Sequence, residues 1–338
     1  MSSSTISQKN LADTLSIAEK LDVVLAYTSI LGNTFFSLLT GIWRTRNAKR
    51  GSYKRYVLLT AVRTMCRRMS PRQILYVNPN TDHAYQTVCK QRDVEPLSET
   101  LEDGTQAHWI GKKGAKKIIL NFHGGGFALP ASPDAVEYMF RLVDGAEKEG
   151  KSLAVLFLSY AGDSAGANLV LALLSHIMHG HPNESIPRVH LSEPLDGAVL
   201  LAPWVTFATS SKSYERNEYK DVIHPSAIKI WSSDYQASAP SDNYIEPLYA
   251  SSSWWSRLPT AVSSILIVAG EDEVFVDDVK AFADNLQKVG TETGGVETKL
   301  FVVENEYHDQ PNFGFGEDCL EKKGSQGWEI GNWTWGRC

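Results

Sequence analysis

The sequence has few cysteines, few glycines and prolines, and no excess of positive charge. Four cysteines without short paired spacing, Cys66, Cys89, Cys319 and Cys338, argue against a disulfide scaffold or a zinc ribbon and favour a reducing environment. The 25 glycines and 14 prolines among 338 residues are too few for a fibrous protein. A formal net charge of −6 argues against nucleic acid as the main partner, and a hydrophobic content of 43% excludes a wholly disordered chain.

Acidic residues are also missing from residues 44–73, which carry ten basic residues. The preceding run, residues 23–43, has no charged residue and is about as long as a bilayer crossing requires, roughly 20 residues. Trp43 at its end and the basic block after it resemble an interface anchor and a cytoplasmic flank. We therefore expect a membrane-associated protein, with the endoplasmic reticulum as one such membrane, or a cytoplasmic one, and no secretion.

Polar residues within the run leave more than one interpretation open; they are Thr28, Ser29, Asn33, Thr34, Ser37 and Thr40. The run is either a membrane helix, a monotopic helix, or a buried helix of a cap over an active site. A cleaved secretory signal is disfavoured because Asp13, Glu19 and Asp22 precede the run, where a signal peptide carries basic residues.

Hydrophobic periodicity predicts three parts of the chain. These are a helical cap or membrane-associated segment at 1–75, an α/β domain at 76–312 and an irregular tail at 313–338. In the first part we expect helices at 11–43 and 53–69. In the second, strands at 117–122, 153–158, 198–201, 265–269 and 300–303 alternate with helices at 132–149, 165–178 and 277–289. This alternation predicts a mostly parallel sheet with helices on both faces.

A nucleophile motif stands at the end of the second expected strand. Residues 162–166 read Gly-Asp-Ser-Ala-Gly, and they follow an apolar strand and open an apolar helix. Small residues on both sides permit the strained turn that exposes the hydroxyl of Ser164. The N–H of Ala165 and the positive end of the helix then lie near any anion formed there.

A glycine-rich loop follows the first expected strand, at His123-Gly-Gly-Gly126. Glycines allow the backbone to approach a substrate closely. The N–H groups of Gly124 and Gly125, together with that of Ala165, are therefore candidates for an oxyanion hole.

An acid and a base follow the last two expected strands. His308 lies just beyond strand 300–303, and an acidic segment, residues 271–278, follows strand 265–269. Catalytic groups collect at such strand ends. The chain order of serine, acid and histidine is that of the α/β-hydrolase triad.

These segments together resemble the hormone-sensitive-lipase-like branch of the α/β-hydrolases. The HGGGF, GDSAGAN and EYHDQP segments are similar to those of fungal steryl acetyl hydrolase-like proteins, over roughly residues 50–312. The resemblance implies an α/β-hydrolase domain at 76–312 that hydrolyses carboxylic esters, acetyl esters among them, of small hydrophobic substrates without a cofactor or metal. It makes Ser164 the nucleophile and His308 the base, with His123 and Asp163 as supporting residues.

At the position of the acid, this sequence departs from the motif of the family. Many relatives carry D-x-L-x-D here, whereas this chain has Glu273-Val-Phe-Val-Asp277. We assign the acid to Glu273, and Asp272 stays the alternative.

One departure concerns the connection between His123 and Ser164. The family has two strands there with a helix between them, and this chain has room for one strand only. A crossover helix and a strand are missing, because a parallel crossover needs about a dozen residues. Strand 153–158 must feed the nucleophile turn directly. A truncated, catalytically inactive relative is therefore the alternative to an active esterase.

Overall fold

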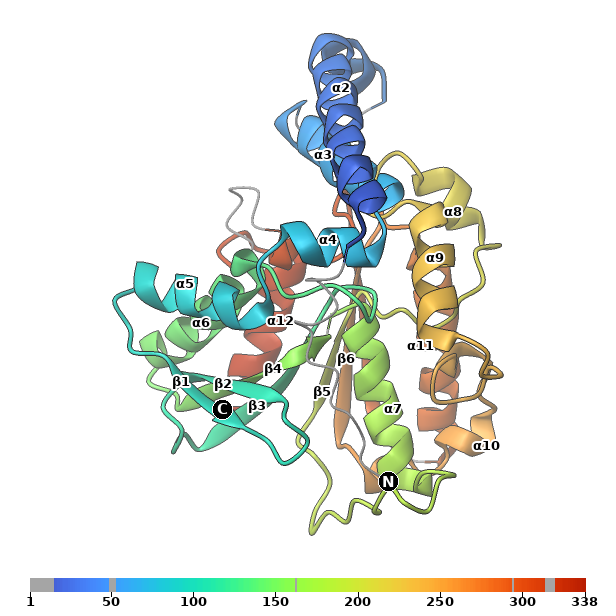
Figure 1. The fold of residues 1–338 in the computed structure, drawn as a ribbon. Coiled ribbons are helices and arrows are strands. Elements are labelled where there is room, and N and C mark those ends of the chain that lie inside the picture. Colours follow the sequence, from blue (N-terminus) through green and yellow to red (C-terminus); the bar gives the residue numbers. More distant parts are fainter. Residues whose placement is uncertain (1–14, 49–52, 162, 294, 314–319) are drawn as a thin grey trace.

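The computed structural model describes residues 15–48, 53–161, 163–293, 295–313 and 320–338. Its strands form two separate sheets, and helices cover both faces of them (Figure 1). The main helices of the α/β part are α6 (Pro133–Lys148), α7 (Ala165–His179), α9 (Pro225–Gln236), α11 (Val276–Thr293) and α12 (Gln326–Trp335). Two shorter helices, α8 (Lys212–Asn217) and α10 (Ser252–Trp255), lie in the connections.

The first sheet has four strands in the order β1-β2-β4-β3. Strand β4 pairs antiparallel with β2 on one side and parallel with β3 on the other. Helix α6 connects β3 to β4, and its buried apolar face packs on this sheet. The strands are β1 (Leu97–Thr100), β2 (Gln106–Gly111), β3 (Lys117–His123) and β4 (Leu153–Ala161).

The second sheet has three parallel strands in the order β5-β6-β7. The central strand is buried at every position, which explains why its sequence is a continuous apolar run. Helix α11 connects β6 to β7 and packs on both. The strands are β5 (Ala198–Leu201), β6 (Ser264–Gly270) and β7 (Glu297–Val303).

A seam separates the two sheets between β3 and β5. Strand β4 keeps its place between β2 and β3, and the chain then passes directly into α7, so the prediction that strand 153–158 feeds the nucleophile turn is confirmed. Among the described residues, no strand is paired with both β3 and β5. Ile118 and Leu120 of β3 are consequently 51% and 45% exposed. The sheet is therefore parallel only in part, and it is interrupted where the sequence lacks a strand.

Two helices and one ion pair connect the sheets across the seam. Helix α7 contacts both β3 and β5 on one face, and α12 contacts both β6 and α6 on the other. The ammonium of Lys117 in β3 binds the carboxylate of Asp196, just before β5. The halves are thus held together by side-chain packing, in place of a ladder of backbone hydrogen bonds.

Helix α12 contradicts the prediction of an irregular tail at 313–338. Its tryptophans pack closely against other elements on more than one side, so the sequence shows no clear helical period. The Trp335 indole N–H donates to the carbonyl of Leu142 in α6 at 3.0 Å. The Trp333 ring lies so close to Gly197 that a Cβ there would clash with it. Ile330 joins Leu266 and Val268 in an apolar cluster over the second sheet.

Of the N-terminal helices described, the first three lie at the top of the molecule in Figure 1 and the fourth packs beside α6. The predicted helices at 11–43 and 53–69 appear as α2 and α3, which pack antiparallel against each other. A capping box between Ser70 and Gln73 starts the short helix that follows. The four helices are α2 (Ile17–Ala48), α3 (Tyr53–Arg68), α4 (Pro71–Val77) and α5 (Thr81–Gln91).

The gap between the two sheets predicts that truncating apolar residues will lower the free energy of unfolding less in β3 than in β6. Leu120→Ala in β3 should lower the free energy of unfolding by less than about 1.5 kcal/mol, because its side chain is 45% exposed. Leu266→Ala in β6, the matched control, should cost about 2–5 kcal/mol because Leu266 is fully buried. Urea denaturation measures both values. Equal costs for the two variants would mean that a continuous sheet buries Leu120 in solution.

Candidate active site

Ser164 occupies a strained turn at the start of α7. Its φ of 60° and ψ of −93° lie outside the regions that side-chain-bearing residues favour. Its backbone N–H donates to the carbonyl of Leu201 at 3.2 Å, and its carbonyl accepts from the N–H of Trp204 at 3.0 Å. These two hydrogen bonds attach the turn to the end of β5, although the strand before the turn, β4, does not pair with β5. Gly162, the first residue of the motif, lies outside the described residues.

His308 and Glu273 approach each other, each from a loop that follows a strand of the second sheet. The imidazole Nδ1 lies 3.4 Å from Oε2 of Glu273, and both side chains are almost completely buried. The ring of Phe275 meets the imidazole edge-on, with centroids 5.0 Å apart. Burial raises the pKa of Glu273 well above its ordinary value and lowers that of His308 to about 4. Burial therefore favours the uncharged form of both groups before a substrate arrives.

Asp272, the alternative acid, points elsewhere. Its carboxylate accepts a hydrogen bond from Lys220 at 3.0 Å and lies 3.8 Å from the guanidinium of Arg55. Of the two candidates, the structure brings Glu273 to the imidazole and places Asp272 in a separate ion-pair cluster.

The glycine-rich loop lies next to Ser164 but uses its N–H groups unequally. The N–H of Gly124 donates to the carboxylate of Asp163 at 3.3 Å. Gly125 has a φ of 129°, and a Cβ at this position would lie 2.5 Å from the Leu129 carbonyl, so only glycine fits. Ala165, as the first residue of α7, has an N–H without a partner inside its own helix. The N–H of Gly124 is therefore already engaged by Asp163.

The side chain of His123 contacts the backbone of the glycine-rich loop. One ring nitrogen lies 2.7 Å from the carbonyl of Gly124, and the other lies 3.2 Å from the hydroxyl of Thr81 at the start of α5. The ring also stacks on Phe157 of β4 with a centroid separation of 5.7 Å. These contacts place His123 between the glycine-rich loop, α5 and β4.

Asp163 belongs to a buried polar network that the sequence alone did not reveal. The amide of Asn312 donates to the Asp163 carboxylate and, at 2.8 Å, to that of Asp309. Burial raises the pKa of Asp163 to about 7. It also raises the pKa of Asp309, with the Asp163 charge adding to the effect. Burial therefore favours the neutral form of each of these two carboxyl groups. The network links the residue before Ser164 to the residue after His308.

A second set of missed residues holds the acid turn. The amide of Asn217 at the end of α8 donates to the carbonyls of Glu271 and Glu273, each at 2.8 Å. Asp221 accepts hydrogen bonds from the backbone N–H groups of Val274 and His308 at 2.7 and 3.0 Å. No motif in the sequence marks either residue, because both act from a connection that is remote in the chain.

Two arginines of α3 contact the same loops, so part of the basic block at 44–73 faces the domain. The buried Arg63 donates to the carbonyls of Asp221 and Tyr219 at 2.9 and 3.2 Å. Arg55 donates to the carbonyl of Asn305, and its guanidinium lies 4.6 Å from the ring centroid of Tyr307. The N-terminal part therefore supports the segment that carries His308.

Aromatic side chains surround the remaining side of the glycine-rich loop. Phe127 stacks on Tyr235 of α9 at 3.8 Å and on Trp204 at 5.4 Å, with Phe207 edge-on at 6.4 Å. Such a wall is suited to an apolar ligand group.

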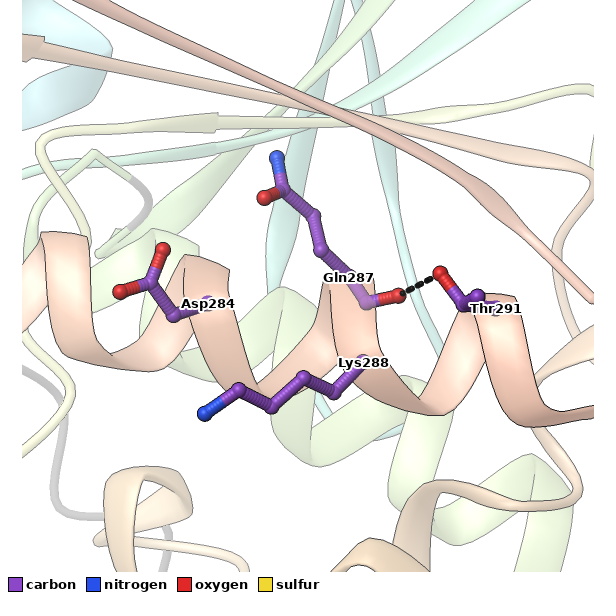
Figure 2. Close-up of a pocket in the computed structure, with 4 residues that line it drawn as sticks. All are labelled: Asp284, Gln287, Lys288 and Thr291. Atoms are coloured by element: carbon purple, nitrogen blue, oxygen red, sulfur yellow. Dashed lines mark hydrogen bonds between the residues drawn. The ribbon is translucent and has the colours of Figure 1, made fainter.

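A shallow pocket elsewhere has no part in this arrangement. Figure 2 shows its lining residues along the outer side of α11, where the hydroxyl of Thr291 donates to the carbonyl of Gln287. Asp284 and Lys288 complete the lining, which offers no nucleophile beside a base. Within the described ranges, no three His, Cys, Asp or Glu side chains lie together as ligands for a metal ion.

The sequence profile of the alpha/beta hydrolase fold matches residues 128–311, more than half of the chain. The chain belongs to the alpha/beta hydrolase fold family. The protein mug81 of Schizosaccharomyces pombe, named as a candidate steryl acetyl hydrolase, is 24% identical over 184 residues, which cover 48% of this chain. The match spans 44% of that relative, so less than half of its length is represented.

Solved structures show the same fold at low sequence identity. A thermostable esterase from Pseudomonas putida superposes with a TM-score of 0.59 at 17% identity, over 83% of this chain and 94% of its own. An esterase of the bacterial hormone-sensitive lipase family superposes with a TM-score of 0.58 at 20% identity, over 85% and 98%. The likeness includes the α/β core and extends beyond the residues that the family profile matches.

The buried Asp163 makes a prediction about pH and stability. Its folded pKa of about 7 lies above the ordinary value of 3.8, so its contribution to stability is complete below pH 3.8 and is lost as the pH rises through 7. Asp163→Asn removes this loss, so the variant should gain stability relative to the native protein between pH 4.5 and pH 8. Urea denaturation at the two values measures the change.

Asp277→Asn is the control, because the pKa of Asp277 is shifted in the opposite direction from that of Asp163. Arg216 holds the pKa of Asp277 below its ordinary value, so that carboxylate stabilises the fold above pH 3.8 and loses its effect on acidification. An Asp163→Asn variant that loses relative stability as the pH rises would contradict the assignment of a raised pKa.

Proposed function

We propose that the protein is a serine hydrolase of carboxylic esters, with Ser164 as nucleophile, His308 as base and Glu273 as acid. The observation that carries the proposal is the strained conformation of Ser164 at the start of a helix, next to a glycine-rich loop. Backbone strain of this kind persists only where the surrounding structure maintains it, and it is typical of a nucleophile turn. The 3.4 Å approach of Glu273 to His308 supplies the other two roles.

The chemistry follows from these roles. His308 takes the proton of the Ser164 hydroxyl as the oxygen attacks the ester carbonyl, and later returns it to the leaving alcohol. The N–H groups of Gly125 and Ala165 stabilise the tetrahedral oxyanion, each by roughly a hundredfold or more in rate. Water then attacks the acyl group by the same route. None of these steps requires a cofactor.

The substrate class that we favour is an acyl ester, acetyl included, of a small hydrophobic alcohol. The aromatic wall of Phe127, Tyr235 and Trp204 supports an apolar substrate group beside the glycine-rich loop. The name of the mug81 relative supports the acetyl ester.

An inactive member of the family is the second candidate, and the seam between β3 and β5 is the observation that favours it. A continuous sheet holds a nucleophile turn through backbone pairing on both sides, and here the turn has such pairing chiefly toward β5. Ester turnover by the purified protein distinguishes the two candidates.

We also propose that α2 binds the surface of a membrane. It is long and apolar enough to cross a bilayer, and only 17% of its most apolar stretch is buried. Its outward side chains include Leu31 and Phe35, which are 68% and 62% exposed. We favour insertion parallel to the surface, because α2 packs along α3, whose charged residues would have to follow a spanning helix into the lipid.

Charge supports an anionic lipid surface as the occupant of this face. Six of the ten basic residues of the block fall between residues 44 and 55, where the sequence passes from α2 to α3. By contrast, Arg68 is held by Asp22 and Arg72 lies 3.4 Å from Glu19. A basic segment near an anionic surface contributes about 1 kcal/mol for each charge.

Replacing the nucleophile tests the catalytic proposal. Ser164→Ala should lower kcat on a short acyl ester by roughly a thousandfold or more and abolish labelling by a fluorophosphonate probe. Ser226→Ala, at the start of α9, is a matched control that should keep both. Circular dichroism checks that all proteins fold alike. A folded native protein that neither labels nor hydrolyses the ester would instead support the inactive candidate.

Removing two apolar side chains from α2 tests the membrane proposal. The full chain should float with phosphatidylserine-containing vesicles, and Leu31→Ser with Phe35→Ser should weaken this binding by roughly tenfold or more, since each exposed side chain contributes about 1.5–3 kcal/mol on burial. Ile118→Ser with Leu120→Ser, which removes exposed apolar side chains from β3, is the control. Equal flotation of both double variants would exclude α2 as the binding face, and binding that survives carbonate would indicate a spanning helix.

A further inference from the structure

Asp221 is a fully buried carboxylate in the connection between α8 and α9. One of its oxygens accepts hydrogen bonds from the backbone N–H of Val222 at 2.7 Å and of His308 at 3.0 Å. The other accepts from the N–H of Val274 at 2.7 Å. A single side chain thereby joins the residue after Glu273 to the backbone of His308.

The position of Asp221 is fixed from outside as well. Arg63 of α3 donates to its backbone carbonyl at 2.9 Å. Asn217, four residues earlier, holds the carbonyls of Glu271 and Glu273. The connection is therefore a rigid support for the acid turn, and moving Asp221 would shift Glu273 and His308 together.

The two carboxylates near the imidazole differ in how they are satisfied. Neither oxygen of Glu273 has a hydrogen-bond donor among the described residues, although Oε2 lies 3.4 Å from His308. Asp221 has three donors. A buried carboxylate needs such donors to hold a negative charge, because burial without them favours its neutral form.

We propose, on the basis of the esterase function above, that Asp221 is a positioning residue that fixes Glu273 against His308 and supplies the negative charge that stabilises the protonated imidazole. Glu273 orients the ring at Nδ1, and Asp221 acts on it from the backbone side. The division of roles explains how a triad works with an acid that has no hydrogen-bond donor of its own.

The charges around the imidazole are consistent with this division. Burial raises the pKa of Asp221 to about 6, and the attraction of His308 opposes that rise, so the group is ionised at neutral pH. Burial also raises the pKa values of Asp309, Asp163 and Glu273, and so favours the neutral forms of these three groups. The basic groups nearby are directed elsewhere: Arg63 binds backbone carbonyls, and Lys220 binds Asp272.

The test compares Asp221→Asn with the native protein and with Asp278→Asn. Asp278 is the matched control, because it is a buried carboxylate that accepts a hydrogen bond from Ser211, the residue before α8, and forms no hydrogen bond or ion pair with the base within the described residues. Two readouts are needed: the acidic limb of the kcat/KM profile against pH, and titration of the His308 ring by NMR. The ring signal is identified by its absence in His308→Gln.

We expect Asp221→Asn to shift the acidic limb by at least about one pH unit toward lower pH and to remove an inflection near pH 6 from the His308 signal, since both report the protonation of Asp221, whose pKa is about 6. Asp278→Asn should change neither. A fall in kcat without a shift would overturn the proposal, because a purely structural role reduces the active fraction at every pH alike. Asp221→Ser repeats the comparison if the asparagine variant does not fold, and failure of both to fold would likewise leave only a structural role.

The NMR readout separates this proposal from the esterase function. A native protein without ester turnover would remove the proposed function, yet the difference in His308 titration between native protein and Asp221→Asn would still decide whether Asp221 stabilises the imidazolium.

Discussion

The catalytic arrangement depends on contacts that cross the seam between the two sheets. The glycine-rich loop extends from β3 in the first sheet, whereas Glu273 and His308 extend from β6 and β7 in the second. In an uninterrupted sheet, backbone pairing fixes such loops relative to one another. Here that task falls to the backbone bonds of Ser164 with the end of β5 and to the Asp163, Asn312 and Asp309 network. Buried polar contacts thus replace a missing strand.

Buried polar networks of this kind are stable only when nearly every member has a partner, because an unpaired group in a low-dielectric interior is costly. Asp163 meets the condition through Gly124 and Asn312, and Asp221 meets it through three backbone N–H groups. Glu273 does not, and a protonated carboxyl at this position is the form with the lower cost. The hydrogen bonds that stabilise this region are therefore made mainly by supporting residues such as Asp163 and Asp221, and less by Glu273.

Sequence reasoning located most of the elements and named the candidate residues, but it did not find the residues that support them. Strands such as 117–122 and 265–269 and the motif around Ser164 are local patterns, and each appears where the periodicity placed it. The choice of Glu273 rested on a spacing within one loop. Asp221 and Asn312 act through partners that are distant in the chain, so no local pattern marks them. Helix α12 was missed because its tryptophans are selected by contacts with Gly197 and Leu142, and a helical period was obscured.

Helix α3 packs against the loop that carries His308 and against the connection that carries Asp221. Arg63 reaches from α3 to the carbonyl of Asp221, whose side chain in turn binds the backbone of His308. Arg55 reaches from the same helix to Asn305 and Tyr307. Helix α2 packs on α3 with its other face exposed. Because Arg55 and Arg63 both lie on α3, anything that binds the exposed face of α2 leaves the contacts between α3 and these loops intact.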